Sequence, residues 1–251
     1  MIRFVLWKWG SVGWKRTNYT AEHVNVAARM IRRHCHVPHD IVCLTDEPSC
    51  IDECRTEPLW HDLAEYSGCF RRLKIVEVAQ DLFDYGDTVI SCDIDCIVLN
   101  NITHLTQFDE PFAIWHRGGK TFGGALYGFK VGNCHDLWRY FDPANIWYHC
   151  KLNRHFKVHG RAVYWPAYRD GYTKGSEQAY IGWWLDRHGV DYHKWGKRDG
   201  IYNAGSWLEH DSRKIKLTGA LPDNARIVFF NGRKNPWDYL PQYRWVEDNW
   251  R

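Results

Sequence analysis

Short apolar segments of strand length alternate with segments of helical period, and this alternation constrains the fold more than any other feature of the chain. Ile2–Trp9 and Asp40–Thr45 are two such apolar segments. Between them, residues 21–34 carry apolar side chains at helical spacing, and Thr20 precedes them as a typical helix N-cap residue. Strands that alternate with helices in this way predict an α/β fold.

The remainder of the chain continues this pattern less regularly. We expect further strands at Asp87–Cys92, Cys96–Leu99, Phe112–His116, Ala125–Val131, Arg213–Leu217 and Arg226–Phe230. We expect further helices at Phe70–Ala79, at Cys134–Phe141, and after Ser176 through His188, with Gly189 as the stop. No internal repeat, low-complexity tract or flexible linker interrupts the sequence. A single domain over residues 1–251 is therefore expected.

Composition excludes several classes of protein. The chain has 251 residues, of which 45% are hydrophobic and 25% charged, and these proportions are those of a globular protein with a sizeable core. No apolar run approaches the roughly 20 residues that a membrane span needs. The first residues lead directly into a strand-like run and lack the regions of a signal peptide. We therefore expect a cytoplasmic protein.

The nine cysteines are an odd number, so a fully paired set of disulfides within one chain is impossible. Cys50/Cys54 and Cys92/Cys96 are each four residues apart, which is not the C-x-x-C spacing of a zinc knuckle. A metal site could combine Cys50 and Cys54 with His61 and Cys69. Reduced, buried thiols are the favoured interpretation.

Positive charge is concentrated between residues 148 and 175. This stretch contains six basic residues and one acidic residue, although the net charge of the whole chain is only +3. Aromatic residues are interleaved with the cations, as in sites for a nucleic-acid strand or a sugar phosphate. The alternative is a solvated face whose aromatic side chains pack inward. The candidate acceptor-binding residues here are Lys151, Arg154, Lys157, Arg161, Trp165 and Arg169.

Two acidic residues end the most strongly apolar strand candidate. Asp93 and Asp95 follow Thr88–Cys92, and in an extended segment residues two apart point the same way. Ligands of open α/β sheets bind at the carboxyl ends of strands. Two neighbouring carboxylates repel each other, so a hard divalent cation that also contacts phosphate is the natural ligand. The alternative is an ordinary turn cap.

Five short motifs occur in a fixed order along the chain. They are Arg72-Leu73-Lys74, Cys92–Val98, Phe122–Leu126, Ser176-Glu177-Gln178 and Asn231–Trp237. This order resembles the GT-A glycosyltransferases, particularly the glycogenin and lipopolysaccharide galactosyltransferase type and its compact bacterial and phage relatives. Trp9-Gly10 and Cys43–Asp46 also resemble the openings of those relatives.

The resemblance implies a three-layer sandwich with a mixed, mostly parallel central sheet. Residues 1–100 would bind the nucleotide sugar, and residues 101–251 would face the acceptor and include a C-terminal metal and phosphate segment. Asp93 and Asp95 would hold Mn²⁺ or Mg²⁺ against the diphosphate, where the metal acts as a Lewis acid on the leaving group. Asn231 stands near the position of a histidine ligand in relatives, and Asn235 replaces the usual lysine before Pro-Trp.

The resemblance also implies roles for the other motif residues. Trp9 and Asp46 would face the base and ribose, Arg72 and Lys74 the phosphate or donor sugar, Gly232 and Lys234 the diphosphate, and Glu177 and Gln178 the reacting carbon. Glu177 as general base predicts inversion, whereas Gln178 against the anomeric carbon is typical of retaining relatives. A first-turn acid favoured by the helix dipole is the alternative for Glu177.

The leading hypothesis is a metal-dependent glycosyltransferase that uses a nucleotide diphosphate sugar, with UDP-sugars favoured. The acceptor is expected to be a hydroxymethylated base in phage DNA, flipped out of the duplex, or a soluble or cell-surface glycan. A non-catalytic nucleic-acid or sugar-binding protein is the alternative from another class. A two-metal nuclease is less consistent, because the sequence lacks the additional acidic cluster. The donor sugar and the oligomeric state do not follow from the sequence.

Overall fold

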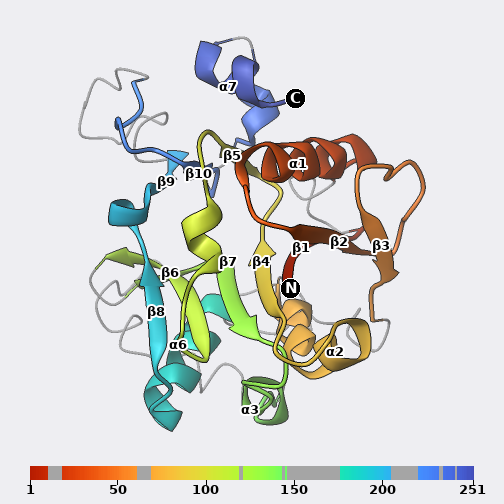
Figure 1. Cartoon of the computed structure of the whole chain (residues 1–251), viewed down its shortest axis with the longest axis vertical. Coiled ribbons are helices and arrows are strands. Elements are labelled where there is room, and N and C mark those ends of the chain that lie inside the picture. Colours follow the sequence, from red (N-terminus) through yellow and green to blue (C-terminus); the bar gives the residue numbers. More distant parts are fainter. Residues whose placement is uncertain are drawn as a thin grey trace. The chain divides into compact units, whose positions relative to one another are not determined.

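A computed structural model describes residues 1–10, 19–60, 69–118, 121–142, 145, 176–204, 220–231, 234–240 and 242–251 (Figure 1). Its strands are β1 (Ile2–Lys8), β2 (His39–Thr45), β3 (Arg55–Pro58), β4 (Thr88–Cys92), β5 (Cys96–Val98), β6 (Phe112–Gly118), β7 (Thr121–Lys130), β8 (Tyr192–Trp195), β9 (Ile201–Asn203) and β10 (Ile227–Phe229). Its α-helices are α1 (Ala21–His34), α2 (Ile75–Leu82), α3 (Asp136–Arg139), α6 (Glu177–His188) and α7 (Arg244–Asn249). Short 3₁₀ helices cover Phe70–Lys74, Thr103–Thr106, Lys197–Asp199 and Pro236–Tyr239.

The strands form a mixed seven-stranded sheet and a smaller three-stranded one in an α/β arrangement, which confirms the predicted fold class. Seven of them have the order β3-β2-β1-β4-β7-β6-β8, and β5-β10-β9 form a second, three-stranded sheet. β1 pairs in parallel with β2, as does β2 with β3, whereas β6 and β7 are antiparallel. None of the helices in the described ranges is long and apolar enough to cross a membrane.

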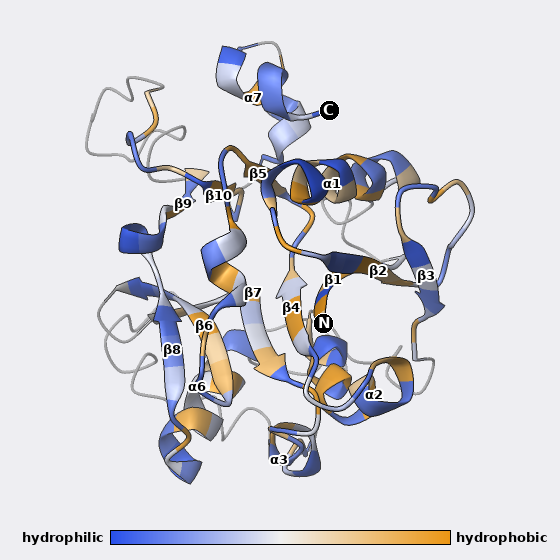
Figure 2. Cartoon of the chain, in the orientation of Figure 1, coloured by the Kyte–Doolittle hydropathy of each residue, from blue (hydrophilic) through white to orange (hydrophobic). Residues whose placement is uncertain are grey.

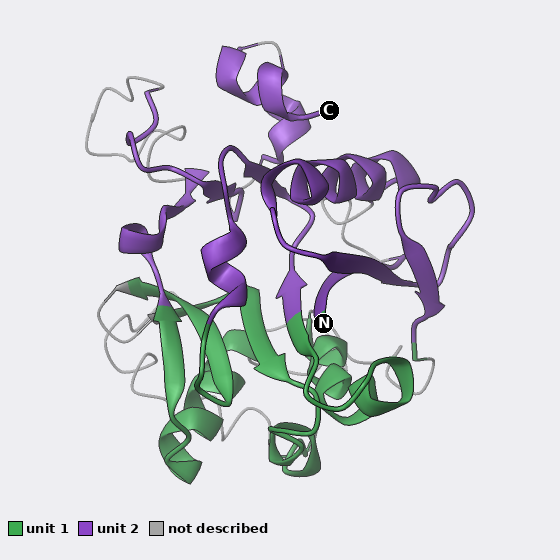
Figure 3. Cartoon of the chain, in the orientation of Figure 1, with its two compact units in different colours: residues 1, 60–89, 108–194 green, residues 2–59, 90–107, 195–251 purple. Residues whose placement is uncertain are grey.

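The chain divides into two compact units (Figure 3). Unit 1 comprises Met1, Trp60–Val89 and Phe108–Lys194, and unit 2 comprises Ile2–Leu59, Ile90–Gln107 and Trp195–Arg251. Each unit therefore takes segments from the first and the second half of the sequence.

In unit 2, helix α1 begins and ends as its local sequence predicts. The Thr20 hydroxyl accepts a hydrogen bond from the His23 backbone, and the His23 ring accepts one from the Thr20 backbone, which together make a capping box. The apolar positions of the helix are buried, and its charged residues lie on the other face (Figure 2). The strands β1 and β2 bury their central residues in the same unit. The predictions for residues 2–9, 21–34 and 40–45 are thus confirmed.

In unit 1, helix α6 also follows its predicted start and stop. The Ser176 side chain accepts a hydrogen bond from the Ala179 backbone, and Gly189 takes the left-handed conformation, with φ 60°. The helix buries Trp184 against Phe112 of β6, whose ring also stacks on Tyr127 of β7. The α6 helix therefore packs on the β6–β7 hairpin through large aromatic side chains.

Several elements differ from the predictions. Residues 70–82 form a 3₁₀ helix followed by α2 instead of one helix over 70–79. The tight first turn carries the side chains of Arg71 and Arg72 inward together with Leu73, whereas an amphipathic α-helix would leave some of them outside. Gly123 and Gly124 lie within β7, not before it. The strand predicted at residues 213–217 lies outside the described residues.

Candidate functional site

Asp93 and Asp95 lie in unit 2, in the short connection between β4 and β5. The connection bends at Ile94 and Asp95, so the alternation of an extended strand does not apply to it. Asp93 is partly exposed and Asp95 is buried. The bend arises because the chain leaves β4 and enters the three-stranded sheet with β10.

The segment after β10 lies against this connection. Phe229 pairs with Cys96 in the antiparallel β5–β10 ladder. The next residue, Phe230, donates its backbone N–H to the carbonyl oxygen of Asp95, at 2.9 Å. The structure therefore brings Asn231, which follows Phe230, close to the acidic pair along the backbone. Gly232 lies outside the described residues.

The chemistry of this connection suits a hard cation. The pKa of the buried Cys96 thiol is raised by its hydrogen bond with Cys92, by burial, and by the negative charges of Cys92, Asp95 and Asp93. Among the described residues, no group of three or more His, Cys, Asp or Glu side chains could hold a metal. Mg²⁺ is commonly held by one or two carboxylates together with substrate phosphates, and the acidic pair fits this pattern.

Trp9 and Asp46, the residues predicted to bind the base and ribose, lie at the ends of β1 and β2, which a hydrogen bond connects. The backbone N–H of Gly10 donates to both carboxylate oxygens of Asp46, at 3.2 and 3.1 Å. Trp9 is partly exposed, and its ring meets Trp7 edge-on, with the ring centroids 6.4 Å apart. Trp7 in turn donates its indole N–H to the Ser91 hydroxyl of β4, at 2.8 Å. These contacts fix the ends of three strands in unit 2.

The C-terminal Lys-Asn-Pro-Trp segment is anchored by aromatic contacts. Trp237 stacks on His23 of α1, with the ring centroids 3.7 Å apart. The backbone N–H of Asn235 donates to Asp238, at 2.7 Å, and so starts a short 3₁₀ helix. Lys234 is exposed, and its ammonium group lies 4.9 Å from the centre of the Tyr239 ring. Lys234 is therefore accessible to an anion.

Arg72 and Glu177 form a buried ion pair in unit 1. Their side chains are only 4% and 3% exposed. The Nε of Arg72 donates to both carboxylate oxygens of Glu177, at 3.1 and 3.2 Å, and its Nη2 makes a further hydrogen bond to the same carboxylate. Tyr127 donates its hydroxyl to the Arg72 carbonyl, at 3.2 Å. Lys74 points elsewhere, with its ammonium group 5.8 Å from the centre of the Trp138 ring.

Gln178 is held by the backbone N–H of Gly124, which lies at a shift in the register between β6 and β7. Ile114 pairs with Tyr127, but the next residue, Trp115, pairs with Gly123, so residues 124–126 have no partner in β6. The N–H of Gly124 instead donates to Oε1 of Gln178, at 3.2 Å. Because a backbone N–H only donates, the Gln178 amide must turn its oxygen toward Gly124 and its NH₂ group away.

Gly124 also lies so close to the ion pair that a Cβ atom here would make a tight contact with it. A Cβ atom at this position would lie 3.0 Å from a carboxylate oxygen of Glu177 and 3.6 Å from Nη2 of Arg72. The structure thus assembles Arg72, Gly124, Glu177 and Gln178 into one cluster, here called the Arg72 cluster. Since both oxygens of Glu177 already accept hydrogen bonds from Arg72, Glu177 is a poor general base, and Gln178 is the better candidate to contact a substrate.

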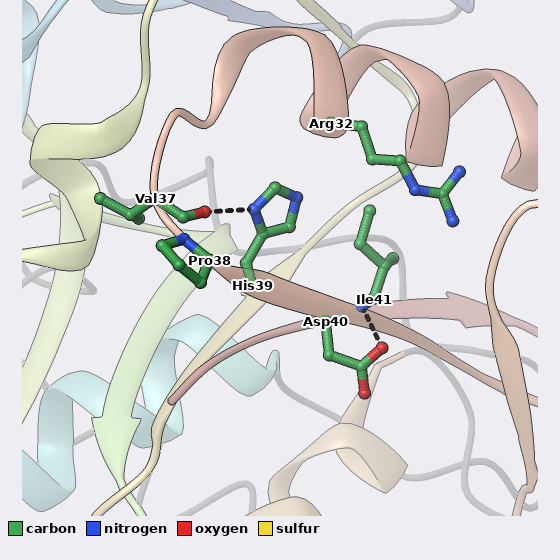
Figure 4. A pocket seen from close by; sticks show the side chains of 6 residues that line it. All are labelled: Arg32, Val37, Pro38, His39, Asp40 and Ile41. Carbon is green, nitrogen blue, oxygen red and sulfur yellow. Dashed lines mark hydrogen bonds between the residues drawn. The ribbon is translucent and has the colours of Figure 1, made fainter.

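Neither the predicted acceptor-binding residues nor the pocket near β2 adds to the candidate site. The predicted acceptor-binding residues Lys151, Arg154, Lys157, Arg161, Trp165 and Arg169 lie outside the described residues. A pocket of 420 Å³ lies at the amino end of β2 (Figure 4), away from the strand ends where Asp46 lies. Its polar side chains bind the protein itself: His39 Nδ1 donates to the Val37 carbonyl, and Asp40 accepts from the Ile41 backbone. We therefore assign the pocket no ligand.

Tyr127 and Ser91 support the candidate residues from within the sheet, and neither was predicted from the sequence. Both look like ordinary strand residues in the sequence. Tyr127 is 55 positions from Arg72, and Ser91 is 84 positions from Trp7, so no local pattern could reveal these contacts.

Comparison with known proteins identifies the fold. No protein-family model matches the sequence, and a search of curated proteins gives no match. Among solved structures, an active-site mutant of LgtC, in which a glutamine is replaced by glutamate, superposes with a TM-score of 0.56 and 14% identity over 98% of this chain and 94% of that chain. The galactosyltransferase LgtC in complex with donor and acceptor sugar analogs gives a TM-score of 0.57 and 12% identity over 98% and 93%. The chain therefore has the GT-A fold of the galactosyltransferase LgtC.

Proposed function

We propose that this chain is a metal-dependent glycosyltransferase that moves a sugar from a nucleotide diphosphate sugar to an acceptor hydroxyl. The observation that carries the proposal is the acidic connection Asp93–Asp95, with the segment leading to Asn231 hydrogen-bonded to it, in a chain with the fold of LgtC. Donor and acceptor sugar analogs are bound in the LgtC complex, and this supports a nucleotide-sugar donor.

Residues of unit 2 would bind the nucleotide. Asp93 and Asp95 would hold Mn²⁺ or Mg²⁺, which supplies positive charge to the diphosphate as it leaves. Asn231 would add an amide oxygen, and Lys234 would contact phosphate from its exposed position. Trp9 and Asp46 would bind the base and ribose. A uracil base is favoured only by the resemblance to UDP-sugar enzymes.

Gln178 is proposed to contact the donor sugar or the reacting carbon. Its NH₂ group is directed away from Gly124 and is available to a sugar oxygen. An active-site glutamine is replaced in one LgtC structure, which supports a catalytic-site role for a glutamine in this fold. Arg72 and Glu177 would then position Gln178 through the helix that carries it, rather than transfer protons themselves.

Calorimetry tests the donor site directly. Titration of the purified protein with UDP and Mn²⁺ should show binding that Asp93→Ala and Asp95→Ala each weaken at least about 10-fold, by analogy with the loss of metal contacts. Asp81→Ala is the matched control, since Asp81 is exposed on α2. UDP binding that is unchanged in both variants would contradict the proposal.

The proposal has two versions, which differ in the acceptor: a saccharide or a modified DNA base. The acceptor sugar analog bound to LgtC supports a saccharide acceptor, whereas the prediction of a modified DNA base depends on the basic stretch at residues 148–175. Gel-shift titration against salt tests the DNA version. Binding through several cations would weaken steeply as salt increases, and a flat response or the absence of binding would exclude it.

A further inference from the structure

Six aromatic rings of unit 1 contact one another in an unbroken series between α3 and α6. Along the series, the members are Trp138, Phe141, Tyr180, Trp183, His188 and Tyr140. Trp138 stacks on Phe141 at one end, with the ring centroids 4.9 Å apart, and Tyr140 stacks on His188 at the other, at 4.6 Å. We call these six residues the ring surface. None of them belongs to the candidate donor site or to the Arg72 cluster.

The ring surface is buried at its centre and accessible at its ends. Tyr180 is fully buried and donates its hydroxyl to the Leu137 carbonyl, at 3.1 Å, which fixes the series to α3. Tyr140, by contrast, is 44% exposed. Trp138, Phe141 and Trp183 are partly exposed, and His188 is exposed. The core thus holds the exposed rings in a fixed arrangement.

Among the described residues, the charge around the rings is balanced. The described residues of α3, of 140–142 and of the last turn of α6 contribute the basic residues Arg139 and Arg187, and Lys74 lies over Trp138. The same segments contribute the acidic residues Asp136, Asp142 and Asp186. The described part of this surface has no excess of cations and so would not itself attract a polyanion, because nucleic-acid binding depends on neutralising phosphates. Fixed aromatic rings with polar edges instead suit an uncharged ligand that has apolar faces.

We propose that the ring surface binds a neutral oligosaccharide, as a second contact for a long acceptor chain. Pyranose rings present apolar C–H faces that pack on aromatic side chains, while their hydroxyl groups hydrogen-bond polar ring edges such as the Tyr140 hydroxyl and the His188 imidazole. This inference rests on the proposed glycosyltransferase function and specifies its acceptor class.

The ring surface lies at a distance from Gln178, so acceptor binding there can be tested apart from the reaction. Gln178 is in the first turn of α6 and His188 is its last residue, so about 15 Å of helix lies between them. A change at Tyr140 therefore leaves the reacting groups in place. It should weaken the binding of a long acceptor without altering donor hydrolysis.

Calorimetry of the full chain without donor or metal tests the inference. The probes are the neutral hexasaccharides maltohexaose, mannohexaose, galactohexaose and N-acetylchitohexaose, and a single-stranded DNA of twelve thymidines. At least one hexasaccharide should bind the wild type, and Tyr140→Ala should weaken it by about threefold to tenfold, as for the loss of one aromatic contact. Tyr140→Phe keeps the ring but loses the hydroxyl, so it should bind more tightly than Tyr140→Ala and less tightly than the wild type. Tyr85→Ala is the matched control, since Tyr85 is exposed and lies elsewhere in unit 1.

Three results would overturn the inference: none of the four hexasaccharides binds, Tyr140→Ala binds them as well as the wild type, or the ring surface binds the DNA instead. UDP-sugar hydrolysis is measured in parallel with the same variants. Hydrolysis that persists without hexasaccharide binding refutes only the ring surface. If a hexasaccharide binds but no UDP-sugar is hydrolysed, the proposed transferase is refuted, and the chain is a sugar-binding protein.

Discussion

Removal of one partner of the Arg72–Glu177 pair should destabilise the protein severely. Arg72→Met leaves the Glu177 carboxylate, only 3% exposed, without its guanidinium. Loss of one member of a buried pair typically costs about 3–5 kcal/mol, a large share of the roughly 5–15 kcal/mol that stabilises a folded protein. With a urea m-value of about 2–3 kcal/mol/M, the unfolding midpoint should fall by about 1–2.5 M.

The double variant separates stability from function. Arg72→Met combined with Glu177→Leu replaces the pair by apolar side chains of similar size, and such replacements are often neutral or stabilising. The double variant should therefore recover most of the lost stability, while sugar transfer stays low because Gln178 has lost its support. Arg139→Met with Asp136→Leu is the control, since that pair is exposed and should contribute less than about 1 kcal/mol.

Urea unfolding followed by circular dichroism measures all of these variants. The reasoning is refuted if Arg72→Met leaves the midpoint unchanged, or if the effects of the two single substitutions simply add in the double variant. Additivity would mean that the two side chains do not interact in solution.

Two further predictions concern packing and pH. Gly124→Ala should cost about 1–3 kcal/mol and reduce transfer, because its Cβ would press on the carboxylate of Glu177; unchanged thermal unfolding and activity would contradict this. Burial lowers the pKa of His23, His34 and His104 below 6.5, so the unfolded chain takes up these protons more readily than the native one. The free energy of unfolding should therefore decrease as the pH falls from 7.5 to 5, and a flat profile in urea titrations would show that these rings are solvated.

Local signals predicted the helices best. Thr20 and Ser176 cap α1 and α6 as expected, and Gly189 ends α6, since each of these signals acts within a few residues. Strand β3 was missed because Arg-Thr-Glu-Pro contains neither apolar alternation nor a β-branched run. Its position beside β2 at the end of the sheet tolerates Pro58, as edge strands do.

The sequence predicted which residues belong to the candidate site better than it predicted their geometry and partners. The sequence indicated both acidic residues but also an extended geometry, and the structure bends the chain there, because β5 joins a different sheet from β4. Arg72 was predicted to face a phosphate or sugar, and the structure shows it hydrogen-bonded to Glu177, which is 105 residues away. No sequence pattern of either residue reports such a pairing, since it depends on how the helix and the 3₁₀ turn pack against β7.

Residues 124–126 of β7, which have no partner in β6, constrain the length of this segment more strictly than its residue types. Tyr127 and Gly123 pair with neighbouring residues of β6, so the three positions between them form a counted spacer. A deletion or an insertion of one residue here would shift one side of the hairpin and turn alternate side chains to the opposite face. Natural variation in this segment should therefore consist of substitutions at constant length, with Ala125 and Leu126 exchanged for other small or apolar residues.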